Sequence, residues 1–286
     1  MITAKNVSVI KGGKTILKDI SFELHSGMIC IAVGKNGAGK TTLLEALTKA
    51  NTINEGKLLW ENINYLEISM QEMALKRAVL SQSVNIAFPI RVSELVEMGT
   101  YALAGPMRKK EQAEIIASTL EETGLTTMAS RYYNTLSGGE QKRALLARCL
   151  VQLKCSRQKG KSQFLFLDEP TSSLDIEQQF KLARLLKKLA KKYQIGIFAI
   201  LHDINLAAFL ADEIILLKAG RIIKKGSPDA VLTPKILEKT LDISVIINPH
   251  PVYGCPNITM VPLTDETPDE ASLVYQKSNL ENEKYL

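Results

Sequence analysis

Alternating and continuous runs of apolar residues divide the first part of the chain into strands and helices. Residues 2–9 and 15–24 lie on either side of a Gly-Gly pair and predict a β-hairpin. Residues 28–33 are a short apolar run rich in β-branched side chains, and leucines three or four positions apart in 42–48 indicate a helix. A strand, a loop and a helix are therefore expected to follow one another over residues 28–48.

Helical spacing dominates between residues 83 and 155, where strand signals are few. Ser93 is a suitable N-cap for a helix over 94–98, and a second helix is predicted over 109–123, where Gly124 ends it. We expect this stretch to form an α-helical subdomain inserted into an α/β core.

Strand and helix patterns alternate again in the second half of the chain. The apolar runs 164–167 and 195–201 suit parallel strands covered on both faces, and residues 176–193 between them predict a helix with one apolar side. Residues 213–218 and 221–225 predict a closing hairpin. The fold class is therefore expected to be α/β, with a parallel core sheet and an antiparallel β subdomain.

The carboxyl-terminal part has a different character. A helix is predicted to begin at Pro234, and prolines punctuate residues 249–256. Residues 264–286 carry six acidic residues against two lysines with little apolar periodicity, which is typical of a disordered tail. We expect a main domain over 1–240, an extension over 241–263 and this tail.

Composition narrows the possible classes of protein. Among the 286 residues, 45% are hydrophobic and 23% charged, as in soluble globular proteins. No apolar run approaches the ~18 to 20 residues that span a bilayer, and no signal-peptide pattern opens the chain, so a cytoplasmic location is expected. The four cysteines form no C-x-x-C pair, so neither a zinc site nor a disulfide framework is indicated; they are Cys30, Cys149, Cys155 and Cys255.

The net charge of +6 raises the possibility of a nucleic acid or an anionic membrane as partner. Much of this charge lies in residues 184–192 and 154–161, where a solvated helix face and an exposed loop explain it. Aromatic residues make up 6% of the chain and do not alternate with the basic clusters. No nucleic-acid partner is expected.

A phosphate-binding loop follows the strand predicted over 28–33. Residues 34–42 fit G-x-x-x-x-G-K-[ST] at every specified position, so a nucleoside triphosphate is the expected ligand. Backbone N–H groups and the positive end of the following helix would bind phosphate oxygens. Lys40 would reach the β- and γ-phosphates, and the Thr41 hydroxyl would bind Mg²⁺. The phosphate loop consists of Gly34, Lys35, Asn36, Gly37, Ala38, Gly39, Lys40, Thr41 and Thr42.

Two carboxylates follow the apolar run 164–167. Ligands gather at the carboxyl ends of parallel strands, so Asp168 is placed to support Mg²⁺ and Glu169 to polarise the water that attacks the γ-phosphate. Alone, Asp-Glu-Pro would be a turn that ends a strand. In a chain with a phosphate loop, the catalytic interpretation is favoured.

A third motif is a Ser-Gly-Gly turn before a helix predicted over 142–153. Its residues are Leu136, Ser137, Gly138, Gly139 and Glu140. With all three motifs in order, residues 1–240 resemble the ATP-binding cassette (ABC) family, whose signature loop this is. In that family two cassettes pack head to tail and each signature loop covers the nucleotide of the partner. The resemblance implies a homodimeric ATPase that uses ATP and Mg²⁺.

Further positions match the same family. The resemblance assigns Gln82 to Mg²⁺ and the attacking water, Asp175 to communication across the dimer, and His202 to the γ-phosphate. One stretch departs from the pattern, because many cassettes stack adenine on an aromatic residue just before the first Gly-rich turn, where this chain has Val9, Ile10, Lys11 and Gly12, so Ile10 or a neighbour would lie under the base. Recognition of the base is then expected to be apolar.

The resemblance also bears on transport. A cassette without a membrane span needs a separate permease. Residues 201–208 resemble import ATPases for iron complexes and cobalamin, and residues 85–99, 154–163 and 249–254 are similar to haem (hemin) importer ATPases. This implies an ATPase on the cytoplasmic face of the membrane, bound to an integral-membrane permease dimer and served indirectly by a haem-binding protein.

Other functions remain open at the level of sequence. A ferric-siderophore or cobalamin importer would share these motifs, and a non-transport ABC ATPase acting on nucleic acid is a second alternative. A plain P-loop kinase would leave residues 136–140 unexplained.

Overall fold

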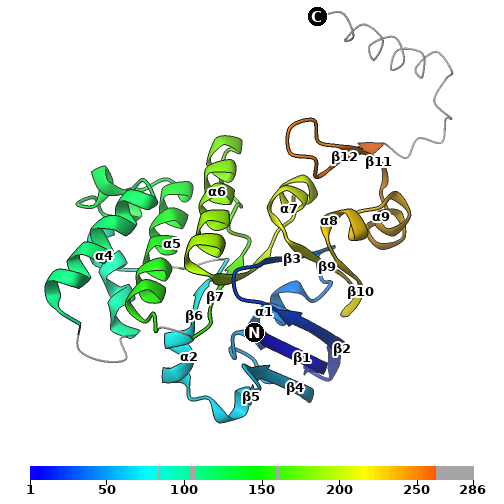
Figure 1. The fold of residues 1–286 in the computed structure, drawn as a ribbon, viewed down its shortest axis with the longest axis horizontal. Helices are drawn as coiled ribbons and strands as arrows, with labels where there is room; N and C mark the ends of the chain where they lie inside the picture. The colour runs from blue at the N-terminus through cyan, green and yellow to red at the C-terminus, as the bar shows by residue number, and fades with distance from the viewer. Residues whose placement is uncertain (83, 85, 103–106, 159–160, 262–286) are drawn as a thin grey trace, which may run out of the picture.

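An antiparallel sheet opens the chain in the computed structural model, which describes residues 1–82, 84, 86–102, 107–158 and 161–261 (Figure 1). Strands β1 (Ile2–Lys11) and β2 (Lys14–Leu24) pair across Gly12 and Gly13, both of which have positive φ. Strands β4 (Glu55–Trp60) and β5 (Ile63–Asn64) complete the order β2-β1-β4-β5. The predicted amino-terminal hairpin is confirmed.

The central sheet has the strand order β10-β9-β3-β8-β7-β6. Its strands are parallel except β10, which pairs antiparallel with β9. Every residue of β7 and β8 is buried, as expected for parallel strands covered on both faces. Their bounds are β3 Ile29–Gly34, β6 Arg77–Leu80, β7 Gln163–Asp168, β8 Ile195–Ile200, β9 Glu213–Lys218 and β10 Arg221–Gly226.

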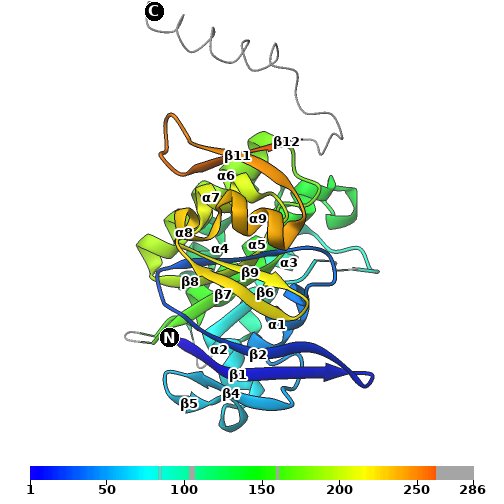
Figure 2. The same cartoon turned by 90° about the vertical axis from the view of Figure 1, so that its right-hand side faces the viewer.

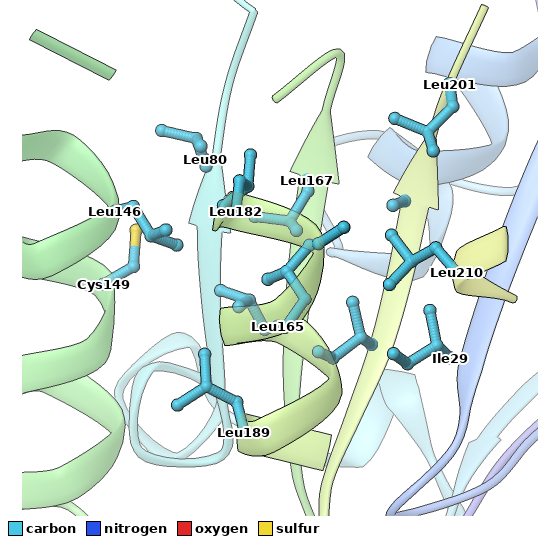
Figure 3. Close-up of a cluster of buried hydrophobic side chains, with 14 of the residues drawn as sticks. Ile29, Leu80, Leu146, Cys149, Leu165, Leu167, Leu182, Leu189, Leu201 and Leu210 are labelled. Carbon is cyan, nitrogen blue, oxygen red and sulfur yellow. The ribbon is translucent and has the colours of Figure 1, made fainter. Parts of the chain in front are cut away.

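Successive residues of β7 enter two different cores, because side chains alternate between the faces of a strand. Phe164 and Phe166 pack toward the antiparallel sheet, where Trp60 meets Phe164 edge to face with ring centroids 5.0 Å apart. Leu165 and Leu167 face the helices α5 (Gly138–Cys155), α6 (Ile176–Tyr193) and α7 (Ile204–Leu210), as Figure 3 shows. The central sheet is therefore the middle layer of the molecule.

Helices fill the chain between β6 and β7. The predicted N-cap at Ser93 is wrong, because α3 (Val92–Glu97) begins earlier and the Arg91 N–H donates to Glu94 Oε2 at 2.7 Å. Helix α4 (Lys109–Glu122) ends before Gly124, whose φ is positive, as predicted. The remaining helices here and before β6 are α1 Lys40–Leu47, α2 Met70–Lys76 and α4 Lys109–Glu122, with 3-10 turns at Tyr65–Glu67, Met98–Ala102, Thr126–Met128 and Tyr133–Thr135.

The carboxyl-terminal extension contains a hairpin that the sequence did not predict. After α8 (Pro228–Val231) and α9 (Pro234–Leu241), strands β11 (Ser244–Pro249) and β12 (Pro256–Val261) pair antiparallel. They lie at the opposite end of the molecule from β1 and β2 (Figure 2). The tail expected over 264–286 lies outside the described residues. Within those residues, no helix has both the length and the apolar character needed to cross a membrane.

Candidate nucleotide site

The phosphate loop connects β3 to α1, as predicted. Gly37 and Gly39 have φ of +78° and +100°, a region that favours glycine. At Gly34 a Cβ atom would lie 2.4 Å from the Leu217 carbonyl oxygen. The loop therefore needs its glycines both for backbone conformation and for close packing.

Lys40, the first residue of α1, is buried across the mouth of the loop. Its Nζ donates to the carbonyl oxygens of Gly34 at 2.7 Å and Lys35 at 3.0 Å. Burial lowers the pKa of Lys40, and the carboxylates of Asp168 and Glu169 act in the opposite direction. The next residue, Thr41, is exposed at the start of the helix. The lysine is thus placed between the loop and the acidic pair.

The turn between β9 and β10 packs against the phosphate loop and is hydrogen-bonded to it. The Gly220 N–H donates to the Ala38 carbonyl oxygen at 3.0 Å, and the Lys18 N–H donates to the Gly220 carbonyl oxygen at 2.9 Å. A Cβ atom at Gly220 would lie 2.2 Å from the Ile16 carbonyl oxygen. This turn therefore connects β2 to the phosphate loop.

Three strand ends bring Gln82, Glu169 and His202 together. These residues follow β6, β7 and β8, which are neighbours in the sheet. Gln82 Nε2 donates to Glu169 Oε2 at 2.8 Å, and His202 Nε2 lies 2.6 Å from Glu169 Oε1. The Glu169 side chain is only 18% exposed, so both carboxylate oxygens are held in place.

Asp168 has the properties of a metal ligand. The residue is buried, and its Oδ1 has no hydrogen-bond partner among the described residues. Burial raises the pKa of its carboxyl group, Glu169 and Glu45 add to this effect, and Lys40 opposes it. A buried carboxylate oxygen without a donor fits a hard cation such as Mg²⁺.

Carboxylates alone do not surround a metal position at this site. The described part of the chain contains no group of three or more His, Cys, Asp or Glu side chains that could hold a metal ion. A cation beside Asp168 would therefore need hydroxyl, amide or phosphate oxygens as further ligands, which is the usual situation for Mg²⁺.

The signature turn (residues 136–140) begins helix α5 through a capping box. Ser137 Oγ accepts from the Glu140 N–H at 3.4 Å, and the Ser137 N–H donates to Glu140 Oε2 at 2.8 Å. A Cβ atom at Gly139 would lie 2.9 Å from Leu174 Cδ2. Within this chain the turn therefore packs against the segment that precedes α6. The helix begins at Gly138, four residues before the start predicted from the sequence.

Asp175 caps helix α6, since its Oδ1 accepts from the Gln178 N–H at 2.8 Å.

Two polar contacts of the site were not predicted from the sequence. Lys142 Nζ donates to the Glu169 carbonyl oxygen at 2.7 Å, and Lys35 pairs with Asp242 of the carboxyl-terminal extension. Ile10, which with its neighbours was expected to offer an apolar surface to the base, is 42% exposed near the end of β1.

The geometry defines a class of protein. A glycine-rich loop at a helix N-terminus binds phosphate, a carboxylate held by an amide and an imidazole can orient water, and a buried carboxylate beside it can bind a cation. Together these groups suit hydrolysis of a nucleoside triphosphate by a P-loop ATPase. Residues 17–172 match the ABC transporter family, and the chain belongs to that family.

Two hemin import ATP-binding proteins are similar to this chain over nearly its whole length. The chain is 39% identical over 254 residues to the hemin import ATP-binding protein HmuV of Hydrogenovibrio crunogenus, covering 88% of this chain and 96% of that protein. It is 40% identical over 261 residues to HmuV of Hahella chejuensis, covering 90% of this chain and 99% of that protein.

Solved structures support the assignment to the ABC cassette fold. The bacterial ABC transporter cassette MJ0796, known as a dimer, has a TM-score of 0.69 and 26% identity, covering 79% of this chain and 98% of that one. Its post-hydrolysis state, bound to ADP and Pi, has a TM-score of 0.68. The predicted α/β cassette fold and the predicted ATPase class are confirmed.

Proposed function

We propose that this chain is the ATP-hydrolysing subunit of a hemin importer. The observation that carries the catalytic part is the Glu169 carboxylate, fixed between Gln82 and His202 beside the phosphate loop. The cargo rests on the hemin import ATP-binding proteins, which match this chain over about nine-tenths of its length.

The proposed mechanism assigns each group one task. Lys40 and the N–H groups of the phosphate loop bind the β- and γ-phosphates. Thr41, Gln82 and Asp168 would hold Mg²⁺, which, when bound, supplies positive charge that stabilises the phosphate oxygens. Glu169 accepts a proton from the attacking water. His202 holds Glu169 Oε1 and contacts the γ-phosphate.

We propose that two copies of the chain form a homodimer around ATP. The signature turn offers the N–H groups of Gly138 and Gly139 at the start of α5, a helix N-terminus suited to phosphate. In the proposed dimer, this turn binds the nucleotide held by the partner's phosphate loop, and Asp175 communicates between the two sites. The signature residues are Leu136, Ser137, Gly138, Gly139 and Glu140.

In this proposal residues 1–240 form the ATPase domain, with 83–155 as its helical subdomain and 241–263 as an extension. The dimer binds an integral-membrane permease dimer on the cytoplasmic face of the membrane, and a hemin-binding protein delivers the cargo to that permease. Closure of the cassettes on ATP and reopening after hydrolysis would drive the permease. A ferric-siderophore or cobalamin importer is the alternative cargo assignment.

The substitution Glu169→Gln tests the catalytic assignment. Glutamine keeps the size of the side chain but cannot accept the proton, so kcat should fall by at least ~100-fold. Binding of ATP should stay within about 2-fold of wild type, because the phosphate loop is unchanged. Steady-state hydrolysis and equilibrium binding of ATP measure the two quantities.

Glu177→Gln is the matched control, since this glutamate lies exposed on α6 and pairs only with Lys181 among the described residues. It should leave both quantities unchanged. Near-normal hydrolysis by Glu169→Gln would contradict the proposed role of Glu169.

A further inference from the structure

The backbone at Glu169 is held in an uncommon conformation. Its φ is +49°, in the left-handed region, which costs a residue with a side chain roughly 1 kcal/mol or more. The Glu169 carbonyl oxygen accepts from Lys142 Nζ at 2.7 Å, Ser172 Oγ at 3.1 Å and the Ser172 N–H at 3.2 Å. These hydrogen bonds hold the peptide group that follows the carboxylate-bearing residue.

Lys142 is the long-range member of this group. Ser172 belongs to the same turn as Glu169, whereas Lys142 lies on α5, one helical turn after Gly138. Its ammonium group also contacts Ser172 Oγ. No ion pair of Lys142 occurs among the described residues, so its partners are a carbonyl group and a hydroxyl group.

The position of Lys142 has an energetic cost. The side chain is half-buried, and burial lowers the pKa of its amine, while the nearby charges of Glu169 and Asp168 raise it. A lysine that only served solubility would extend into water. Here the ammonium group instead binds the main chain of Glu169.

We propose that Lys142 is a positioning residue for ATP hydrolysis. It fixes the Glu169 main chain so that the carboxylate stays between Gln82 and His202. Lys142 and the signature turn lie on one helix, α5, so this contact joins the segment that carries the signature turn to the main chain of Glu169. This inference rests on the proposed function, in which Glu169 activates the attacking water.

Lys142→Met separates positioning from packing. Methionine has a similar length but no donor, so the Glu169 carbonyl loses one of its hydrogen bonds and the residue can relax toward an ordinary φ. A carboxylate displaced by ~1 Å can cost up to about 100-fold in rate. Lys142→Arg keeps the charge and the donors, and should restore much of the lost rate.

The experiment measures kcat, KM for ATP and Tm for the full chain. For Lys142→Met we expect kcat to fall at least ~10-fold with KM within about 2-fold of wild type, because substrate binding does not involve this residue. Lys142→Arg should lie closer to wild type than Lys142→Met does. Lys181→Met, on the exposed face of α6, is the matched control and should leave kcat and KM unchanged.

The results that would overturn the role of Lys142 differ from those that would overturn the proposed function. Wild-type kcat in Lys142→Met would overturn the inference, as would equal kcat in the methionine and arginine variants. If Lys142→Met does not fold, Lys142→Gln replaces it, because glutamine is polar but lacks the ammonium group; a wild-type kcat would then overturn the inference. A wild-type chain without ATPase activity, or an active Glu169→Gln, would instead defeat the proposed function.

Discussion

A buried carboxylate without a hydrogen-bond partner is the clearest mark of function at the scale of single residues. Among the described residues, Asp168 Oδ1 has no donor, the residue is 5% exposed, and burial raises the pKa of its carboxyl group. The ionised form is therefore less favourable in the folded chain than in the unfolded chain. Natural proteins keep such a group where a ligand compensates for its cost.

Asp168→Asn should therefore stabilise the nucleotide-free protein while weakening Mg²⁺-ATP binding. Tm should rise by about 2–4 °C, which corresponds to ~1 kcal/mol in a domain of this size. The gain should shrink as pH falls toward the pKa of Asp168, because protonation removes the same charge in the wild type. Thermal unfolding in EDTA at several pH values measures this, and an unchanged or lower Tm at neutral pH would contradict it.

The residues of the site could be predicted from sequence where a local motif carries them. The phosphate loop and the acidic pair have fixed spacing and fixed flanking elements, so their positions follow from the chain itself. The contact of Lys142 with Glu169 joins residues 27 positions apart. It depends on how α5 packs beside the end of β7, and no local pattern reports that packing.

At the scale of elements, the turn between β9 and β10 should be as important as the phosphate loop that it supports. Gly220 has φ +74° and no room for a Cβ atom, whereas Gly12 has φ +55° and a Cβ atom added there would meet nothing within 4 Å. Alanine at Gly12 meets only the cost of the left-handed conformation, about 1–2 kcal/mol. Alanine at Gly220 adds a clash with the Ile16 backbone.

Gly220→Ala should therefore lower the free energy of unfolding by at least ~1 kcal/mol more than Gly12→Ala does. It should also weaken ATP binding, because the Gly220 N–H holds the Ala38 carbonyl of the phosphate loop. Urea unfolding and nucleotide binding test both effects. Equal destabilisation by the two variants, with equal ATP affinity, would show that the turn does not support the site.

A helix could be predicted from the sequence where the spacing of its apolar residues and its capping residues indicate the same bounds. Helix α6 occupies the predicted residues 176–193, because Asp175 caps a long amphipathic run. The start of α5 was placed too late, since Gly138 and Gly139 are poor helix formers, although Ser137 and Glu140 carry a capping-box pattern.

The hairpin β11–β12 was missed because prolines at its paired ends argue against strands. Tertiary contacts hold it in place. Asn205 Nδ2 donates to the Ile258 carbonyl oxygen at 3.0 Å, and the Ile258 N–H donates to Asn205 Oδ1 at 2.7 Å. A partner on α7, far away in the sequence, cannot be recognised from residues 244–261 alone.

At the scale of the whole molecule, the central sheet explains why distant motifs form one site. Residues after β3, β6, β7 and β8 meet at the carboxyl edge of parallel strands, where ligands bind in open α/β sheets. Alternating strands and helices predicted this arrangement from sequence. The cargo could not be predicted in the same way, since no residue of the site contacts it in the proposed function.

The most direct test of the central claim is ATP hydrolysis by the chain reconstituted in liposomes with its proposed hemin permease. The binding protein is added hemin-loaded, unloaded, or replaced by cobalamin-loaded and ferric-siderophore-loaded proteins. We predict stimulation by the hemin-loaded protein alone, absent in Glu169→Gln. The account would be contradicted if another cargo-loaded protein stimulated hydrolysis and the hemin-loaded protein did not. Hydrolysis that does not depend on the permease would also contradict it.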